Sequence, residues 1–231
     1  MIAPLLLAAA AAFAEPRLIT AHQADGDEVP CVLFADNDSP KYVVILFPGG
    51  EGNMRIHMDD GRVKFTHVKT FSVQAHYWLN KGEFASVATE STWSEKRIQA
   101  VIDELKKRFP AAKVYLMSTS KGTYASIKLA DYLQDKIAGE IHTSSFQSSV
   151  AKFDGKKYKN RQLLVQHKDD VCFQTPYAGA KASHDKFGTE LITIEGGTTD
   201  HDDCEPGAHH GFAGQQEETV EKIKDWIKRG P

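Results

Sequence analysis

Short apolar runs alternate with amphipathic segments along most of this chain, and this alternation constrains its fold more than any other feature. Seven runs have strand-like composition: 29–34, 42–47, 84–89, 113–117, 139–143, 162–166 and 190–194. Five segments between or after them have apolar residues at helical spacing: 72–80, 94–109, 121–134, 176–187 and 217–229. Strands that alternate with helices predict an α/β fold with a mainly parallel sheet and helices on both faces.

The length and charge of the chain limit the class of protein. Its 231 residues suit one large domain, which we expect to span residues 15–231. The 28 Lys and Arg residues against 31 Asp and Glu give a net charge of −3. This balance offers no electrostatic basis for binding nucleic acid or an anionic membrane surface, so neither is expected as a partner.

The first 14 residues differ in composition from the rest of the chain. An apolar run over 4–13 is too short to cross a bilayer as a helix, and it ends in the small-x-small sequence Ala12-Phe13-Ala14. Because no Lys or Arg precedes it, a buried N-terminal helix is the alternative. We interpret residues 1–14 as a signal peptide and expect a periplasmic or secreted protein without membrane insertion once the signal is removed.

The three cysteines fit an exported protein, because such proteins tolerate disulfides. Cys172 and Cys204 lie in polar loops after strand-like runs, whereas Cys31 lies within the run 29–34. A Cys172–Cys204 disulfide is therefore favoured, with Cys31 as a buried free thiol. The alternative is that all three thiols are reduced.

A strand–turn–helix corner is predicted where the run 113–117 meets the helical pattern 121–134. The sequence there is Ser118-Thr119-Ser120-Lys121-Gly122. A serine at the apex of such a corner is lifted out of the sheet, so that its hydroxyl can meet a substrate. Gly122 leaves room for helix and strand to pass closely, because it has no β-carbon. Ser120 is the expected nucleophile, and Ser118 is a weaker candidate.

Three further loops with suggestive chemistry follow predicted strands. Functional groups of parallel sheets collect on loops past the carboxyl ends of the strands. The first loop, 48–53, is rich in glycine and could supply backbone donors to an oxyanion, or be only a tight turn. The second contains Asp169 and Asp170, either of which could orient an imidazole. The third contains His209 and His210, each a candidate base.

Together these loops resemble those of the α/β-hydrolase superfamily, in which Ser, Asp and His occur in that chain order. The resemblance spans about 29–226. Within the superfamily, the chain resembles small exported bacterial serine hydrolases of the esterase and dienelactone-hydrolase type. It implies that Ser120 is the nucleophile, Asp170 the acid and His210 the base. It also implies that the backbone N–H groups of Lys121 and of the Gly50–Glu51 region form an oxyanion hole. The segment 146–159 is short, so no large cap domain is expected.

The resemblance implies a serine hydrolase that cleaves a carboxylic ester of small or medium size, without a metal or organic cofactor. A peptidase or amidase with the same triad is the enzymatic alternative, and a hydrolase-like binding protein without turnover is the non-enzymatic one. Ser118 and Lys121 also match the Ser-x-x-Lys motif of penicillin-binding enzymes. A metal site is a further alternative on ligand type, and its candidate ligands are His201, Asp202, Asp203, His209 and His210.

Overall fold

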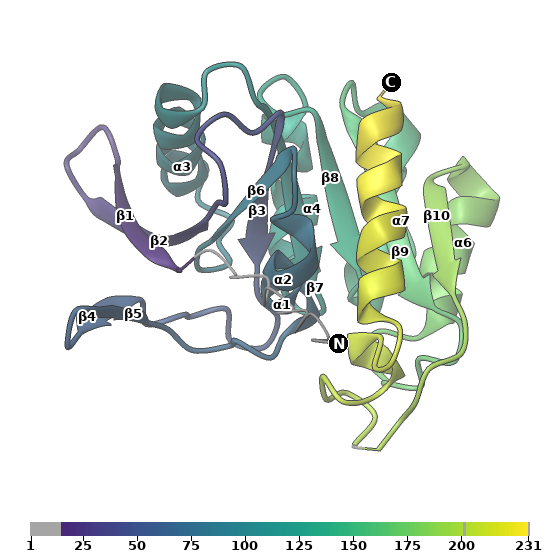
Figure 1. Cartoon of the computed structure of the whole chain (residues 1–231). Coiled ribbons are helices and arrows are strands. Elements are labelled where there is room, and N and C mark those ends of the chain that lie inside the picture. Colours follow the sequence, from purple (N-terminus) through teal and green to yellow (C-terminus); the bar gives the residue numbers. More distant parts are fainter. Residues whose placement is uncertain (1–14, 201, 231) are drawn as a thin grey trace, which may run out of the picture.

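The structure, a computed structural model, describes residues 15–200 and 202–230, so the predicted signal peptide lies outside the described residues. An eight-stranded sheet crosses the molecule (Figure 1). Its strands lie in the order β1 (Arg17–His22), β2 (Glu28–Phe34), β6 (Phe84–Ala88), β3 (Tyr42–Phe47), β7 (Lys113–Thr119), β8 (Gly139–Thr143), β9 (Arg161–His167) and β10 (Glu190–Ile194). β2 is antiparallel to both of its neighbours, whereas every pair from β6 to β10 is parallel.

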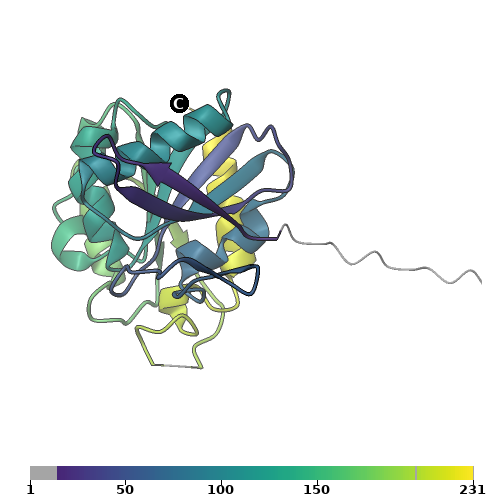
Figure 2. The same ribbon diagram turned by 90° about the vertical axis from the view of Figure 1, so that its left-hand side faces the viewer.

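Helices cover both faces of this sheet, as the alternating pattern predicted. Val43, Ile45 and Phe47 of β3 pack on one face against α3 (Glu95–Arg108) and α4 (Gly122–Leu133). The alternate residues of the same strand, Val44 and Leu46, pack on the other face with α1 (Phe71–Gln74), α2 (His76–Leu79) and α7 (Gln216–Arg229). Side chains of a strand point to opposite faces in turn, so a strand that is apolar throughout needs cover on both sides. Figure 2, viewed from the β1 edge, shows the yellow α7 and the teal helices on opposite sides of the sheet.

The remaining elements are short or lie at the edges. The helices of the second face are α1 (Phe71–Gln74), α2 (His76–Leu79) and α7 (Gln216–Arg229), and α6 (Tyr177–Phe187) packs beside β9 and β10. A hairpin of β4 (His57–Asp59) and β5 (Arg62–Lys64) stands apart from the main sheet. Between β8 and β9 the chain forms only α5 (Gln147–Val150) and the single turn η1 (Gly155–Lys157), so the structure has no large cap.

All seven predicted strands are present, but several of the shorter elements differ from the prediction. The predicted helix over 72–80 is two single-turn helices joined at Ala75, and β1, β4 and β5 were not predicted. β1 is an edge strand with only Ile19 and Ala21 buried, so its apolar signal is weak. No helix in the described part of the chain has the length and apolar composition that a membrane span requires.

The carboxyl ends of the parallel strands meet at one edge of the sheet, where the predicted loops lie side by side. Gly122, the first residue of α4, lies so close to the loop after β3 that a β-carbon there would stand 2.4 Å from the carbonyl oxygen of Pro48. The same oxygen accepts a hydrogen bond of 2.6 Å from the hydroxyl of Ser91. A glycine at position 122 therefore lets the serine corner and the glycine-rich loop pack directly against each other.

Candidate active site

Ser120 occupies the sharp turn between β7 and α4. Its φ of 52° lies in the left-handed region, which non-glycine residues rarely adopt. Hydrogen bonds hold the turn: Ser120 N donates to Thr143 O at 3.1 Å, and Ser120 O accepts from the Thr123 hydroxyl at 2.6 Å. Backbone strain that the surroundings impose in this way is common at functional sites.

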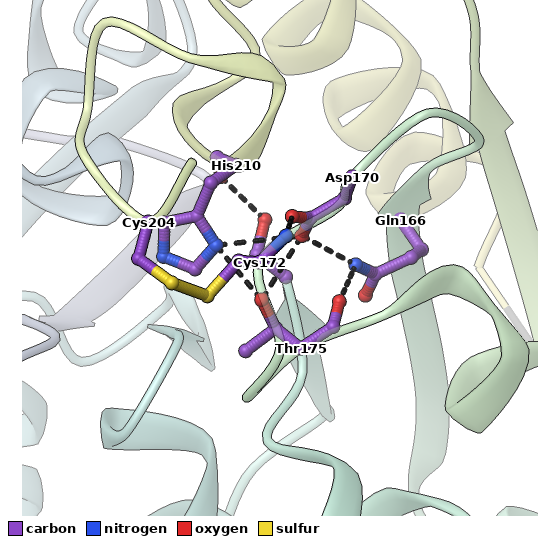
Figure 3. Close-up of a disulfide and its surroundings, with 7 residues drawn as sticks. Gln166, Asp170, Cys172, Thr175, Cys204 and His210 are labelled. Carbon is purple, nitrogen blue, oxygen red and sulfur yellow. Dashed lines mark hydrogen bonds and ion pairs between the residues drawn. A yellow bond between two sulfur atoms is a disulfide. The ribbon is translucent and has the colours of Figure 1, made fainter. Parts of the chain in front are cut away.

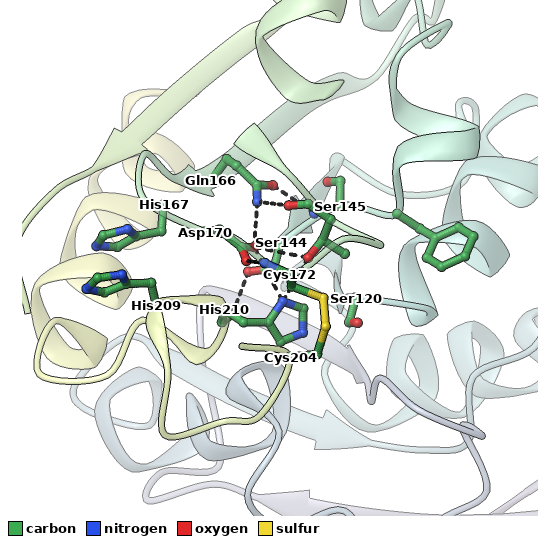
Figure 4. A network of polar contacts seen from close by, with 12 residues as sticks. Ser120, Ser144, Ser145, Gln166, His167, Asp170, Cys172, Cys204, His209 and His210 are labelled. Carbon is green, nitrogen blue, oxygen red and sulfur yellow. Dashed lines mark hydrogen bonds and ion pairs between the residues drawn. A yellow bond between two sulfur atoms is a disulfide. The ribbon is translucent and has the colours of Figure 1, made fainter. Parts of the chain in front are cut away.

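Ser120 and His210 line the same cavity, of about 490 Å³. Both side chains are drawn in Figure 4, together with the polar contacts around His210. The cavity also includes all three residues predicted for the oxyanion hole, Gly50, Glu51 and Lys121. Its other lining residues are Gly49, His67, Lys69, Thr70, Phe71, Thr119, Gln174, Cys204, Glu205, Pro206 and Gly211. The structure thus brings residues from five separate segments, 49–51, 67–71, 119–121, Gln174 and 204–211, to one solvent-accessible space.

The glycine-rich loop after β3 forms the wall of the cavity next to the serine. A β-carbon at Gly49 would lie 3.0 Å from Ser120 Cβ, so backbone and serine are in close contact there. Gly52 N donates to Gly49 O at 3.2 Å and closes a turn around Gly50 and Glu51. At the mouth, Lys121 Nζ lies 3.2 Å from Glu51 Oε1, in an exposed ion pair between the loop and the serine corner.

Asp170 is buried after β9 and accepts hydrogen bonds on both carboxylate oxygens (Figure 3). Cys172 N donates to Oδ1 at 3.0 Å. Oδ2 accepts from Gln166 Nε2 at 2.9 Å and from the Thr175 hydroxyl at 3.0 Å, and it lies 3.3 Å from His210 Nδ1. Since an ionised carboxylate can only accept, this set of donors suits a negatively charged Asp170.

His210 lies in the turn η2 (His209–Gly211), with its side chain only 9% exposed. Its backbone is anchored as well as its ring, because the Ser144 hydroxyl donates to His210 O at 2.6 Å. Ser144, directly after β8, has a φ of 42°. It is thus a second serine, besides Ser120, whose backbone adopts the left-handed conformation at this site.

The two competing candidates, Asp169 and His209, lie outside this arrangement. Asp169 is exposed, and its backbone oxygen is 3.2 Å from His209 Nδ1. The His209 ring stacks on His167, with centroids 4.3 Å apart and planes 3° from parallel. Figure 4 shows this histidine pair on one side of the group formed by Asp170 and His210. The geometry therefore favours the second residue of each neighbouring pair.

The disulfide between Cys172 and Cys204 is present, with Cα atoms 4.8 Å apart (Figure 3). It joins the loop of Asp170 to the loop that leads to His210, and Cys204 lines the cavity. Cys31 is a buried free thiol, and burial raises its pKa to about 11. Cys31 is thus a protonated, inert residue of the core.

The remaining alternatives find less support. Ser118 is fully buried, with its hydroxyl 2.7 Å from that of Ser126, and Lys121 pairs with Glu51, so Ser118 and Lys121 do not form a nucleophile–base pair. Among the described residues, the group with metal-ligand spacing is Asp170, Cys172 and His210, but the Cys172 sulfur is bonded to Cys204. Of the predicted metal ligands this group contains only His210, and His201 lies outside the described residues.

Sequence reasoning missed several residues of the site. Gln166 and Thr175 surround the Asp170 carboxylate, and Ser144 holds the backbone of His210. Gln166 carried only a weak signal, since it is the polar last residue of the predicted strand 162–166, which also begins with a glutamine, Gln162. Thr175 and the cavity wall from His67 to Phe71 had none, because their places depend on how loops fold back over the sheet.

Comparison with solved structures identifies the fold. The chain is similar to a serine hydrolase without a lid from Xanthomonas campestris, with a TM-score of 0.61, 12% identity and coverage of 90% of this chain and 95% of that one. It is similar to Est1E from Butyrivibrio proteoclasticus, with a TM-score of 0.63, 17% identity and coverage of 92% and 98%. An esterase domain from Rhodothermus marinus gives a TM-score of 0.64 at 9% identity, with coverage of 94% and 99%.

No protein-family model matches the sequence, and no curated protein does. The solved structures are similar to this chain over nearly its whole length and over theirs. At these identities the likeness shows the fold, which is that of the α/β hydrolases without a lid.

Proposed function

We propose that this protein is a serine hydrolase that cleaves carboxylic esters through an acyl-enzyme on Ser120. The observation that carries the proposal is the buried Asp170–His210 pair, 3.3 Å apart, whose imidazole lines the same cavity as the serine at the strained corner. Nucleophile, base and acid in this relation form the general apparatus of acyl transfer. The esterases among the structural neighbours support the same reaction class.

In the proposed mechanism, the Ser120 hydroxyl attacks the ester carbonyl carbon while His210 Nε2 takes its proton. The oxyanion is stabilised by backbone N–H groups of Lys121 and of the turn at Gly50 and Glu51, and one such donor is typically worth about 3–4 kcal/mol. Collapse of the tetrahedral intermediate expels the alcohol, which takes the proton from His210. Water then attacks the acyl-enzyme with His210 again as base, and the acid is released as Ser120 regains its proton.

The substrate class follows from the cavity. Most of the side chains that line it are polar or charged, among them Glu51, His67, Lys69, Gln174 and Glu205, and Phe71 is the single aromatic hydrocarbon ring. The absence of a large cap leaves the cavity open, so we propose small or medium-sized esters as substrates.

Covalent labelling tests the nucleophile. A fluorophosphonate probe, followed by mass spectrometry of the labelled peptide, should modify Ser120 in the wild type. Ser120→Ala should abolish labelling and lower kcat/KM on a panel of acetyl to octanoyl chromogenic esters by at least about 10³-fold, because the covalent step is removed. The panel should show highest activity with the shorter acyl groups.

Ser118→Ala is the matched control, since it removes a neighbouring hydroxyl that is buried away from the cavity. This variant should still be labelled at Ser120. Labelling that moves to Ser118, or an Ser120→Ala protein with wild-type turnover, would refute the proposal. Turnover of an amide panel at rates equal to the esters would instead assign a peptidase or amidase.

We further propose that the mature, exported protein is a single domain that begins at Glu15. The disulfide supports an oxidising compartment, because such bonds rarely persist in the cytosol. N-terminal analysis of protein recovered from the periplasm or medium checks this, and an intact Met1 there would contradict it.

A further inference from the structure

The hydroxyl of Thr175 lies between the acid and the base of the proposed triad. Its oxygen is 2.9 Å from His210 Nδ1 and 3.0 Å from Asp170 Oδ2. The direct separation of His210 Nδ1 from Asp170 Oδ2 is longer, at 3.3 Å. The nearest acceptor for the imidazole N–H is therefore a neutral hydroxyl and not the carboxylate.

The hydrogen-bond directions at this point are determined by which groups can donate. Asp170 as a carboxylate has no proton to give, so the single hydroxyl proton of Thr175 goes to Oδ2. The Thr175 oxygen therefore presents a lone pair to His210 Nδ1 and accepts this hydrogen bond, so Nδ1 must carry the hydrogen. This fixes the tautomer in which His210 Nε2 is unprotonated and free to accept the proton of Ser120.

Thr175 is itself held rigidly. Its side chain is fully buried, and its N–H donates to Cys172 O at 3.0 Å. Gln166 Nε2 donates both to Thr175 O, at 2.7 Å, and to Asp170 Oδ2, at 2.9 Å. Gln166 is in turn oriented by Ser145 N, which donates to its Oε1 at 2.9 Å. The hydroxyl therefore cannot turn away from His210 without breaking a connected buried network.

We propose that Thr175 is a positioning residue of the active site: it shares the His210 Nδ1–H with Asp170 and so sets the tautomer and the ring orientation of the base. This inference rests on the proposed serine-hydrolase function. Thr175 does not line the cavity, so it acts through His210 and not on the substrate. Its loss should affect kcat and leave KM nearly unchanged.

The test compares Thr175→Val, which removes the hydroxyl at nearly constant volume, with Thr175→Ser, which keeps it. Removing a hydrogen bond to a group that becomes charged during the reaction should lower kcat by about 10- to 100-fold. Thr175→Ser should stay within about 3-fold of the wild type. Thr219→Val is the matched control, because Thr219 is a buried threonine of α7 whose hydroxyl donates to Gln215 O at 2.7 Å.

A second readout does not depend on turnover. The low-field proton NMR signal of His210 Nδ1–H should shift in Thr175→Val and should remain at the wild-type position in Thr175→Ser and Thr219→Val. If the valine variant does not fold, Thr175→Ala replaces it in both measurements, with the same expected results.

Two outcomes would overturn the inference: a wild-type kcat and NMR signal in the variant without the hydroxyl, or an equal loss in the valine and serine variants, which would point to methyl packing. Either result would leave the proposed function intact if Ser120→Ala is inactive and unlabelled. Retained activity in Ser120→Ala would instead reject the function itself, so the two failures are distinguishable.

Discussion

Asp169 and Asp170 are neighbours in the loop after β9, but the carboxylate of Asp170 is buried and that of Asp169 is exposed. Asp170 is 4% exposed and meets three donors besides His210, whereas the side chain of Asp169 lies in solvent. The difference arises because Asp170 N donates to His167 O at 3.2 Å, in a turn that directs the second aspartate inward. Charge type alone does not distinguish the two residues, but their hydrogen-bond environments do.

We predict that Asp170→Asn lowers kcat by on the order of 10³- to 10⁴-fold, because an amide in place of the carboxylate favours the wrong imidazole tautomer and leaves the imidazolium without a counter-charge. Asp169→Asn, the matched control one residue away, should change kcat by less than about 3-fold. Steady-state kinetics on the same ester measure both variants. An equal loss in the two variants would mean that the acid has been wrongly assigned.

Sequence reasoning at this scale predicted Ser120, Asp170 and His210 from their residue types and chain order. The structure places His210 beside Asp170 and in the same cavity as Ser120, and their catalytic roles stay a prediction. Sequence reasoning failed for Thr175, which has no sequence feature that separates it from any other loop threonine. Its position follows from the path of the loop between Cys172 and α6, and that path depends on contacts with Gln166 and His210.

At the scale of elements, the site is assembled from loops whose ends are fixed by parallel strands. The register of β9 and β10 aligns Gln166 with Thr193 and His167 with Ile194, so the loops of Asp170 and His210 leave the sheet side by side. The disulfide then joins these two loops a second time, away from the sheet. Three of the hydrogen bonds to Asp170 come from the disulfide-linked loop or from its base in β9.

We predict that removing this bond by Cys172→Ala and Cys204→Ala together destabilises the protein by about 4 kcal/mol, since chain entropy increases when a loop of this length is opened; the two cysteines are 32 positions apart. kcat should fall because the loops of Asp170 and His210 are then free to separate. Urea unfolding and ester kinetics test the two effects. Cys31→Ala alone, in the core away from these loops, should leave kcat unchanged.

An unchanged kcat in the double variant at moderate temperature would show that the disulfide stabilises the fold without positioning the site. A stability change well below 1 kcal/mol would show that the loops are ordered without it.

The strands and long helices could be predicted because their apolar patterns are long, and these apolar residues pack into the core on the two faces of the sheet. The short elements could not. α1 and α2 were expected as one helix over 72–80, but they are two single-turn helices on either side of Ala75, which itself has helical dihedral angles. Both helices pack against the second face of the sheet. The β4–β5 hairpin buries little, so its sequence has no period of apolar residues by which to recognise it.

At the scale of the whole molecule, a buried polar chain runs beneath the site from one strand to the next. Ser118 bonds Ser126, whose hydroxyl is 2.9 Å from His142 Nδ1. His142 Nε2 lies 2.9 Å from Gln162 Oε1, and Gln162 Nε2 donates to Glu140 Oε1 at 2.9 Å. This hydrogen-bonded series includes an acid, Glu140, and a base, His142, and both are fully buried in the middle of the fold.

The two ionisable groups respond to pH in opposite directions. Burial raises the pKa of Glu140 to about 7, so its contribution to stability is complete below its unfolded value of 4.5 and is lost as pH rises through 7. Burial lowers the pKa of His142 to about 4, so its contribution is complete above 6.5 and is lost as pH falls through 4. Between 4.5 and 6.5 the two slopes oppose each other, and their contributions to the stability of the wild type should nearly cancel.

We predict that Glu140→Gln removes this cancellation. The free energy of unfolding of the variant, measured by urea titration from pH 4 to 8, should rise up to about pH 6.5, because, of this buried pair, the His142 contribution alone remains. Relative to the wild type, the variant should gain stability between pH 4.5 and about 7, by an amount on the order of 3 kcal/mol. Glu95→Gln, on the exposed start of α3, is the control that removes one carboxylate at the surface. If the Glu140→Gln curve ran parallel to the wild type over the whole range, Glu140 would be titrating alike in the folded and unfolded chains. Glu140 would then contribute no pH dependence to the fold.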